Sequence, residues 1–141
     1  MTAPDPAAGA SAGPETARGA GPARIAALRR RADFLKAAQA RRQVTPGFLL
    51  QARRRDGAEA GTGADEVRVG FTCSRKLGNA VARNRARRRL RAVARAVLPG
   101  AARPGWDYVL VGRPGATAER EFRALVADLG AALARIHGGG G

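Results

Sequence analysis

The sequence predicts an α+β fold in which helices pack against a mixed β-sheet. Three observations support this fold class. The predicted elements follow the order helix, two strands, helix, strand, helix. The candidate strands are short apolar runs or alternate with period two, whereas two long segments place their apolar residues at helical spacing. Elements in such an order, with no regular alternation of strand and helix, are typical of an α+β sandwich.

A single domain of residues 24–137 is predicted between two tails. Residues 1–23 consist almost wholly of Ala, Gly, Pro, Ser and Thr, and such a segment cannot bury enough apolar surface to offset its ordering entropy. We therefore expect a disordered tail there. The glycines of residues 138–141 form a second tail, and His137 at its edge is expected to be solvated.

The first half of the domain is predicted to contain a helix, a strand and a loop. The helix covers residues 31–40, with Ile25 and Leu28 packing ahead of it. A strand follows over residues 48–53, where an apolar run is followed by alternating polar and apolar residues. Residues 54–65 contain glycines and charges but no large apolar side chain, which predicts a loop.

The second half begins with a strand over residues 67–74, where apolar and polar residues alternate. Cys73 is expected to be a small buried or half-buried residue of this strand. Asn79 is a good N-cap and Pro99 a good stop signal, so a helix is predicted over residues 80–98.

A buried strand over residues 106–112 and a helix over residues 118–136 complete the domain. Thr117 is the candidate N-cap of this last helix. Its apolar residues fall on one face, which is typical of a helix that packs against a core. This stripe consists of Phe122, Leu125, Val126, Leu129, Ala132, Leu133 and Ile136.

The charge of the chain points to a polyanionic partner. Lys and Arg total 26 against 11 acidic residues, giving a formal net charge of +15. Such an excess favours nucleic acid or an anionic membrane surface as the partner. One Cys and one His exclude a disulfide framework and a Cys/His zinc site, and the lone thiol fits the reducing cytoplasm. No apolar run approaches the ~20 residues that span a bilayer.

The segment from Arg75 to Arg95 carries nine basic residues and no acidic one. On a helical wheel, apolar residues occupy one sector and arginines the rest, with Asn84 within the basic face and Arg83 at its border. A solvated helix face normally mixes charges of both signs, so this crowding of like charges predicts a polyanion as ligand. An amide among the arginines suits a base edge or a 2′-hydroxyl. The helix start at Asn79 offers a further anion site.

Residues 74–91, SRKLGNAVARNRARRRLR, resemble the signature of the bacterial ribonuclease P protein family, which runs S-K-K-x-G-N-A-V-x-R-N-R-x-K-R-x-x-R. The resemblance extends to Asp33-Phe34, to the strand at residues 68–71, and to Arg113-Pro114-Gly115. It implies an αβββαβα two-layer sandwich with a four-stranded mixed sheet and a left-handed βαβ crossover, as in the second domain of ribosomal protein S5. It also implies a ribonucleoprotein endonuclease that removes the 5′ leader of precursor tRNA.

The same resemblance implies partners and contact residues. The partners would be the catalytic RNA, with one protein per RNA, and precursor tRNA, whose single-stranded leader would enter a cleft that includes Phe34 and Phe48. Core packing is the alternative role for both rings. Ala38 stands where many members carry a second aromatic residue, and Ala92 stands where an acidic residue is usual. The implied RNA-binding residues are Arg75, Lys76, Asn79, Arg83, Asn84, Arg85, Arg87, Arg88 and Arg91.

No arrangement for catalysis by the protein itself is recognisable. The single Cys and single His are far apart in sequence, and the carboxylates sit in loops or at element ends without a marked acid/base pair. We therefore expect an accessory subunit without a metal site of its own, in an endonuclease whose Mg²⁺ is held mainly by the RNA. The main alternative is a general RNA-binding protein of the ribosomal or chaperone type. A membrane-active cationic helix and a duplex DNA binder are weaker alternatives.

Overall fold

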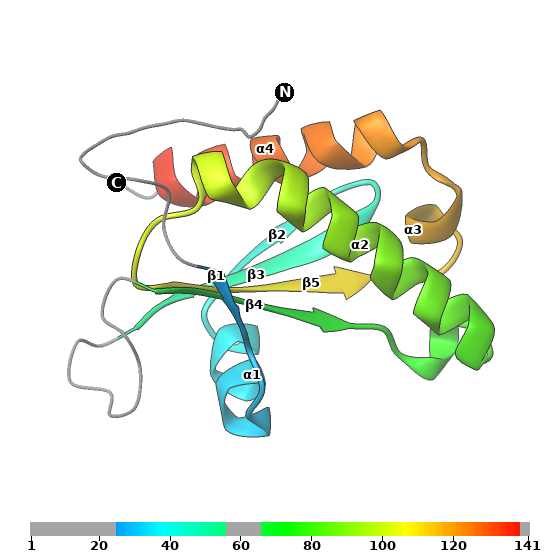
Figure 1. The fold of residues 1–141 in the computed structure, drawn as a ribbon, viewed down its shortest axis with the longest axis horizontal. Coiled ribbons are helices and arrows are strands. Elements are labelled where there is room, and N and C mark those ends of the chain that lie inside the picture. The colour runs from blue at the N-terminus through cyan, green and yellow to red at the C-terminus, as the bar shows by residue number, and fades with distance from the viewer. Residues whose placement is uncertain (1–24, 56–65, 139–141) are drawn as a thin grey trace.

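The structure, a computed structural model, describes residues 25–55 and 66–138. The predicted tail of residues 1–23, the last glycines and nearly all of the loop predicted over residues 54–65 lie outside the described residues. The elements in chain order are β1 (Ile25–Ala27), α1 (Arg31–Ala38), β2 (Arg41–Val44), β3 (Phe48–Arg54), β4 (Val67–Thr72), the 3₁₀ turn η1 (Arg75–Leu77), α2 (Ala80–Ala101), β5 (Trp106–Gly112), α3 (Ala116–Glu119) and α4 (Phe122–Gly138) (Figure 1).

A five-stranded mixed sheet in the order β1-β4-β5-β3-β2 forms the centre of the domain. β1 and β5 run parallel to β4, and β3 runs antiparallel to its neighbours β5 and β2. The α+β class is thus confirmed, but the resemblance implied four strands. The additional strand is β1, whose three residues are too few to show an alternating pattern. α2 connects the parallel strands β4 and β5.

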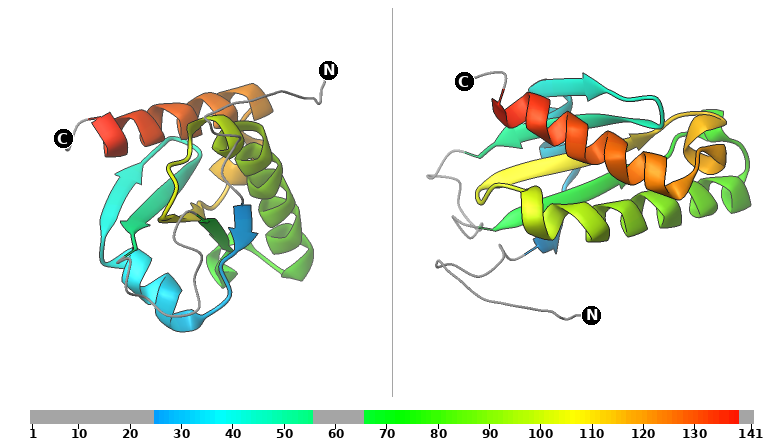
Figure 2. Two further views of the ribbon diagram at one scale, coloured as in Figure 1. Left: turned by 60° about the vertical axis from the view of Figure 1, so that its left-hand side comes forward. Right: turned by 90° about the horizontal axis from the view of Figure 1, so that it is seen from above.

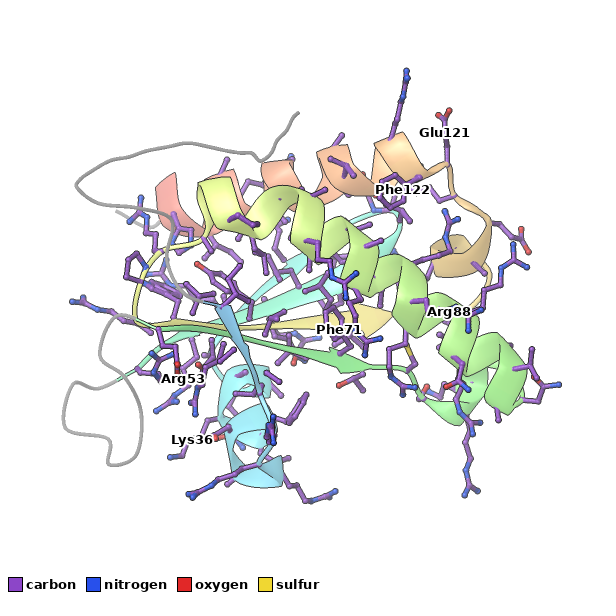
Figure 3. All side chains as sticks on the ribbon, viewed as in Figure 1. Lys36, Arg53, Phe71, Arg88, Glu121 and Phe122 are labelled. Carbon is purple, nitrogen blue, oxygen red and sulfur yellow. The ribbon has the colours of Figure 1, made fainter. Side chains whose placement is uncertain are left out.

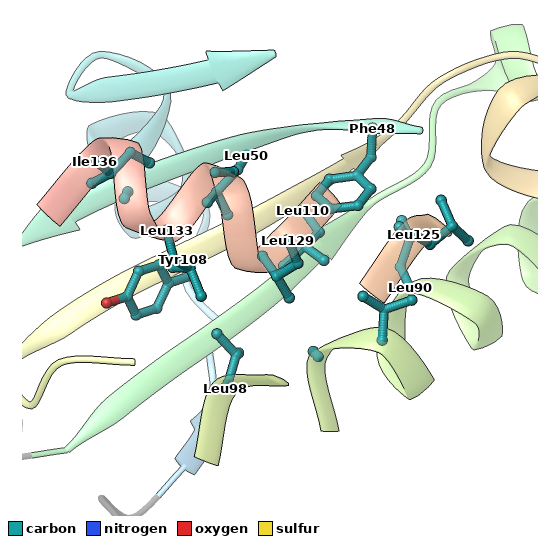
Figure 4. Packing of buried hydrophobic residues seen from close by; sticks show 14 of the residues in the cluster. Phe48, Leu50, Leu90, Leu98, Tyr108, Leu110, Leu125, Leu129, Leu133 and Ile136 are labelled. Carbon is teal, nitrogen blue, oxygen red and sulfur yellow. The ribbon is translucent and has the colours of Figure 1, made fainter. Parts of the chain in front are cut away.

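α2 and α4 lie on one face of the sheet and α1 on the other (Figures 1 and 2). The main core fills the space between the sheet and the α2–α4 layer (Figure 4). Strand alternation directs Phe48, Leu50, Tyr108 and Leu110 into this core, where they are fully buried. The helices contribute Ala86, Leu90, Val93, Ala94 and Leu98 from α2, and Leu125, Leu129, Ala132, Leu133 and Ile136 from α4.

A smaller core lies on the opposite face of the sheet, under α1. Leu28, Ala37 and Val109 are buried in it, and Phe34 and Val111 pack against them while remaining partly exposed. α1 ends close to its predicted limit. Within the described residues, α1 covers only part of this face (Figure 1).

Asp107 forms a buried ion cluster at the start of β5. Its fully buried carboxylate accepts hydrogen bonds from Arg55 Nη1 at 2.6 Å and from Arg68 Nη2 at 2.6 Å and Nε at 2.8 Å. Arg68 Nη1 also lies 3.4 Å from Asp33 Oδ2, which ties α1 to the sheet. No sequence pattern marks this cluster, because an isolated Asp or Arg is normally expected at the surface.

α2 begins where the sequence predicts and ends later. The Asn79 Oδ1 accepts a hydrogen bond from the Ala82 N–H at 2.9 Å, which confirms the predicted N-cap. The helix then continues through Pro99 to Ala101, beyond the predicted end at residue 98. Residues after a proline can still form a final turn, and here the Ala102 N–H closes it on the Leu98 carbonyl at 2.8 Å.

The helix predicted over residues 118–136 is divided into α3 and α4. Arg120 has an extended conformation (φ −67°, ψ 139°) and separates the two helices. Thr117, the predicted cap, has a different role. Its Oγ1 donates a hydrogen bond to the Gly47 carbonyl at 2.6 Å and accepts one from the Arg113 N–H at 2.8 Å. It therefore joins α3 to the turn before β3. No helix in the described part of the chain is long and apolar enough to cross a membrane.

Candidate nucleic-acid interface

The predicted RNA-binding residues lie together on η1 and the N-terminal half of α2. Gly78 connects the two with a φ of +127°, which side chains other than glycine rarely adopt. Arg88 projects from this end of the molecule (Figure 3). Arg83 and Arg87 are half-buried. The exposed members are Arg75, Lys76, Asn79, Asn84, Arg85, Arg88 and Arg91. We call the basic members of this set, with Asn79 and Asn84, the α2 arginine face.

Two internal hydrogen bonds orient side chains of the α2 arginine face. Arg83 Nη1 donates to the Gly78 carbonyl at 3.0 Å, which holds this arginine over the start of the helix. Arg87 Nη1 donates to Asn84 Oδ1 at 3.1 Å. The amide of Asn84 therefore retains its NH₂ donors for a ligand, while its oxygen positions a neighbouring guanidinium.

Arg89 does not belong to this face, although the helical wheel places it among the other arginines. Its Nε donates to the Thr117 carbonyl at 3.0 Å, and its Nη2 donates to the Arg120 carbonyl. Arg89 therefore satisfies carbonyl groups at the α3–α4 junction. The helical wheel could not reveal these contacts, because they are made to the α3–α4 junction and no break between these two helices was predicted.

No carboxylate in the described part of the chain forms an ion pair with the α2 arginine face. No salt bridge within residues 25–55 and 66–138 joins an α2 arginine to a carboxylate; the cluster around Asp107 and the Arg120–Asp128 pair lie elsewhere. Like charges crowded on one helix repel one another. A polyanion relieves this repulsion, and guanidinium groups bind phosphate oxygens with two parallel hydrogen bonds.

A groove of about 550 Å³ adjoins the arginine face beside β1 and β4, and we call it the β4 groove. β1 and Phe34 form one wall, and Arg87, Arg91 and Arg95 of α2 form the other. Residues 69–71 of β4 lie between them. Arg87 and Arg91 therefore belong both to the arginine face and to this groove.

The β4 groove is open because β1 is short. β1 pairs with β4 only at residues 67–69, so Gly70 and Phe71 extend past the end of β1. The Phe71 ring is half-buried there, and the Arg91 guanidinium carbon lies 5.5 Å from its centroid. The Phe71 ring under a cation and the Phe34 ring, which also lines the groove, offer surfaces on which unpaired bases stack.

The structure corrects one of the two predicted cleft residues. Phe48 is fully buried in the main core between the sheet and the α2–α4 layer, so it has the alternative role, core packing (Figure 4). Strand alternation places Phe48 on the face that α4 covers. Phe34 does line the groove, and Phe71 is the aromatic groove residue that sequence reasoning missed.

The single Cys and the single His occupy different sites. Cys73 is buried just after β4, and burial raises the pKa of its thiol, an effect that the charge of Arg87 partly opposes. His137 was expected to be solvated but is half-buried, and its Nε2 lies 2.7 Å from the Tyr108 hydroxyl. The two residues do not form a catalytic pair. Among the described residues no three His, Cys, Asp or Glu side chains are grouped as metal ligands.

The chain matches the family model described as Ribonuclease P over residues 23–137. The ribonuclease P protein component of Ruegeria pomeroyi is 60% identical over 113 residues, covering 80% of this chain and 87% of that protein. The ribonuclease P protein component of Paramagnetospirillum magneticum is 50% identical over 115 residues, covering 81% and 84%.

Solved structures are similar as well. The RNase P protein from Thermotoga maritima has a TM-score of 0.63 and 28% identity, with 79% of this chain and 97% of that chain covered. The Staphylococcus aureus RNase P protein has a TM-score of 0.61 at 21% identity, with 79% and 94% covered, and so shows the fold alone. The chain therefore belongs to the bacterial ribonuclease P protein family, the protein subunits of the endoribonuclease that matures the 5′ end of tRNA.

Proposed function

We propose that this chain binds the catalytic RNA of ribonuclease P through the α2 arginine face and the 5′ leader of precursor tRNA in the β4 groove. The observation that supports this best is the adjacency of the two surfaces. Arg87 and Arg91 line the groove and also lie on the arginine face. A substrate strand in the groove would then lie directly beside the catalytic RNA.

The two surfaces differ in the chemistry that they offer. The arginine face is basic, largely exposed and without aromatic residues, and suits the phosphates of a folded RNA. The β4 groove combines Phe34 and Phe71 with Arg91, and suits a single strand whose bases are unstacked. Each base on an aromatic ring contributes about 1–3 kcal/mol. The 5′ leader is a single-stranded part of the substrate.

The protein's contribution to the reaction is positioning and charge neutralisation. Two of its buried carboxylates have structural partners: Asp107 accepts a hydrogen bond from Arg55, and Asp128 accepts one from Arg120 Nε at 2.8 Å. We assign the Mg²⁺ that activates water to the RNA partner, where it supplies the nucleophile. One protein per RNA, holding the leader beside that site, lowers the entropic cost of the reaction.

The test is single-turnover cleavage of a 5′-extended precursor tRNA by a bacterial ribonuclease P RNA at low Mg²⁺, with and without this chain. Cleavage at the mature 5′ end that depends on the protein supports the proposal. Tight, salt-sensitive RNA binding without stimulation would support the general RNA-binding protein instead. Cleavage by the protein without RNA would reveal a catalytic site on the chain.

A further inference from the structure

A second basic hollow, of about 660 Å³, lies at the other end of the sheet from η1. β5 runs from Trp106, which lines this hollow, to Gly112, where an added Cβ would lie 2.7 Å from Leu77 of η1. The two basic regions are therefore separated by the length of β5. Arg53 marks this end of the molecule and Arg88 the other (Figure 3).

The hollow is lined by arginines and by the rings of Trp106 and His137. Arg41 of β2, Arg54 of β3 and Arg103 before β5 are exposed cations on its walls, and Trp106 is half-buried among them. No acidic residue is among the described residues that line it. Arg53 also contributes to the lining, but its Nη1 lies 3.6 Å from the Asp107 carboxylate.

Contacts inside the hollow hold the rings and one guanidinium in place. The Arg41 guanidinium carbon lies 5.8 Å from the Trp106 ring centroid, and its Nη1 donates to the Ile136 carbonyl at 2.5 Å. His137 meets Trp106 edge-on, with ring centroids 4.5 Å apart. The Nδ1 atom of His137 is buried and has no hydrogen-bond partner among the described residues. A buried polar atom without a partner is costly.

The arrangement fits a nucleotide better than a solvated protein surface. Guanidinium groups that face one space without a carboxylate repel one another, and a phosphate would relieve this repulsion. The layer formed by Arg41 and Trp106 offers a planar surface to an unpaired base. We propose that this hollow binds a phosphate and base of a single-stranded RNA segment, as a second RNA contact separate from the α2 arginine face and the β4 groove.

This second RNA contact is additional to those of the proposed function, and the pKa of His137 reports whether RNA occupies the hollow. Burial, together with the charges of Arg103 and Arg41, lowers the pKa of His137. Among the described residues, the charged and titratable groups around this hollow are Arg41 from β2, Arg53 and Arg54 from β3, Arg103 from the α2–β5 connection and Tyr108, whose hydroxyl contacts His137. A phosphate bound among these arginines offsets their charge, so it should raise the pKa of His137.

The experiment uses the full chain with an oligouridylate, because the chain contains one Trp and one His. Trp106 fluorescence and the His137 imidazole proton resonances then report on this hollow alone. We expect the oligouridylate to change the fluorescence and raise the pKa of His137. Arg54→Gln and Arg103→Gln should each weaken this response and lower its salt slope by about 0.7. Arg123→Gln, which removes one exposed arginine of α4, should leave the response unchanged.

Three outcomes would overturn the inference. Oligouridylate binding that leaves both Trp106 and His137 signals unchanged would place all RNA contacts elsewhere. An equal response to inorganic phosphate at the same phosphate concentration would show a site for the free anion, not for an RNA strand. An equal loss of response in Arg123→Gln would show only an effect of net charge. Precursor cleavage measured in parallel separates these outcomes from a failure of the proposed function.

Discussion

The ring of Phe34 packs directly against the backbone of Gly70 in β4. A Cβ added at residue 70 would lie 2.6 Å from both Cε1 and Cζ of this ring, a distance that real Cβ atoms do not tolerate. Glycine at this position therefore lets α1 place an aromatic side chain at the wall of the β4 groove. The exposed part of the ring faces the groove, while the remainder packs with Leu28.

Phe34→Ala is expected to weaken binding of precursor tRNA by the holoenzyme more than binding of mature tRNA. The loss should be about 1–3 kcal/mol, the contribution of one stacked base. Gly70→Ala should have the same selectivity because it displaces the ring without removing it. Affinities for both tRNAs provide the measurement, with Phe122→Ala as control, since Phe122 is 39% exposed on α4 and outside the groove. Equal losses for precursor and mature tRNA would mean that Phe34 only packs.

Changing Arg83, Asn84 and Arg85 together to Ala should weaken binding to the catalytic RNA while leaving the fold intact. Asn84 and Arg85 are exposed and Arg83 is half-buried, and none of the three belongs to the buried hydrophobic clusters of the described residues. Each lost phosphate contact lowers the salt slope of log K by about 0.7–0.9. The measurement is the dissociation constant as a function of salt, with circular dichroism as the check on folding. An unchanged dissociation constant at physiological salt would remove this part of α2 from the interface.

Arg89→Gln provides a contrast on the same helix. Because Arg89 donates to the Thr117 and Arg120 carbonyls, its loss should lower the free energy of unfolding by about 1–3 kcal/mol. The salt slope of RNA binding should remain that of the unchanged protein. A reduced slope with unchanged stability would place Arg89 on the arginine face, contrary to the structure.

The elements with strong local signals were predicted well from the sequence. α2 combines a capping Asn79 with a long amphipathic pattern, and β5 is apolar apart from Asp107 near its start, so both were found at or near their true limits. The division between α3 and α4 was missed because Thr117 is fixed by a hydrogen bond to Gly47, which is far away in sequence. Local propensity contains no information about such a contact.

Local sequence patterns likewise identified only part of the candidate site. The basic residues of α2 could be named from their motif and their position on one face of a helix. The groove beside them depends on where β1 stops along β4, and therefore on strand register. This register exposes Phe71 and lets Phe34 reach Gly70, whereas alternation in β3 buries Phe48. An aromatic residue in a predicted strand cannot be assigned to groove or core until its neighbours are known.

Asp107→Asn should destabilise the fold strongly. The buried carboxylate accepts hydrogen bonds from Arg55 and Arg68, and removing one partner of a buried pair typically costs about 3–5 kcal/mol. Thermal or denaturant unfolding provides the measurement. Glu119→Gln, which removes an exposed carboxylate of α3, should change stability by no more than about 0.5 kcal/mol. Similar small effects of the two substitutions would show that the cluster contributes little to stability.

Tyr108 should make the stability of the fold depend on pH in the alkaline range. Burial raises the pKa of this phenol to about 12 from an ordinary 10.0, although the Arg103 N–H and the charge of Arg103 oppose the change. Between these two values the unfolded chain loses the phenolic proton while the folded chain keeps it, so stability falls as the pH rises. Below pH 10 this contribution is fully present.

The chain has a single Tyr, so its phenolate absorbance reports this ionisation directly. In the folded protein the absorbance should rise well above pH 10, and in denaturant near pH 10. As the pH rises over this range, the Tyr108→Phe variant should lose less stability than the unchanged protein. The substitution also removes the hydrogen bonds of the hydroxyl to His137 and to the Arg103 N–H. If the folded phenol titrated at its ordinary pKa, Tyr108 would be in contact with solvent, and the packing of α4 over the start of β5 would have to differ from the structure.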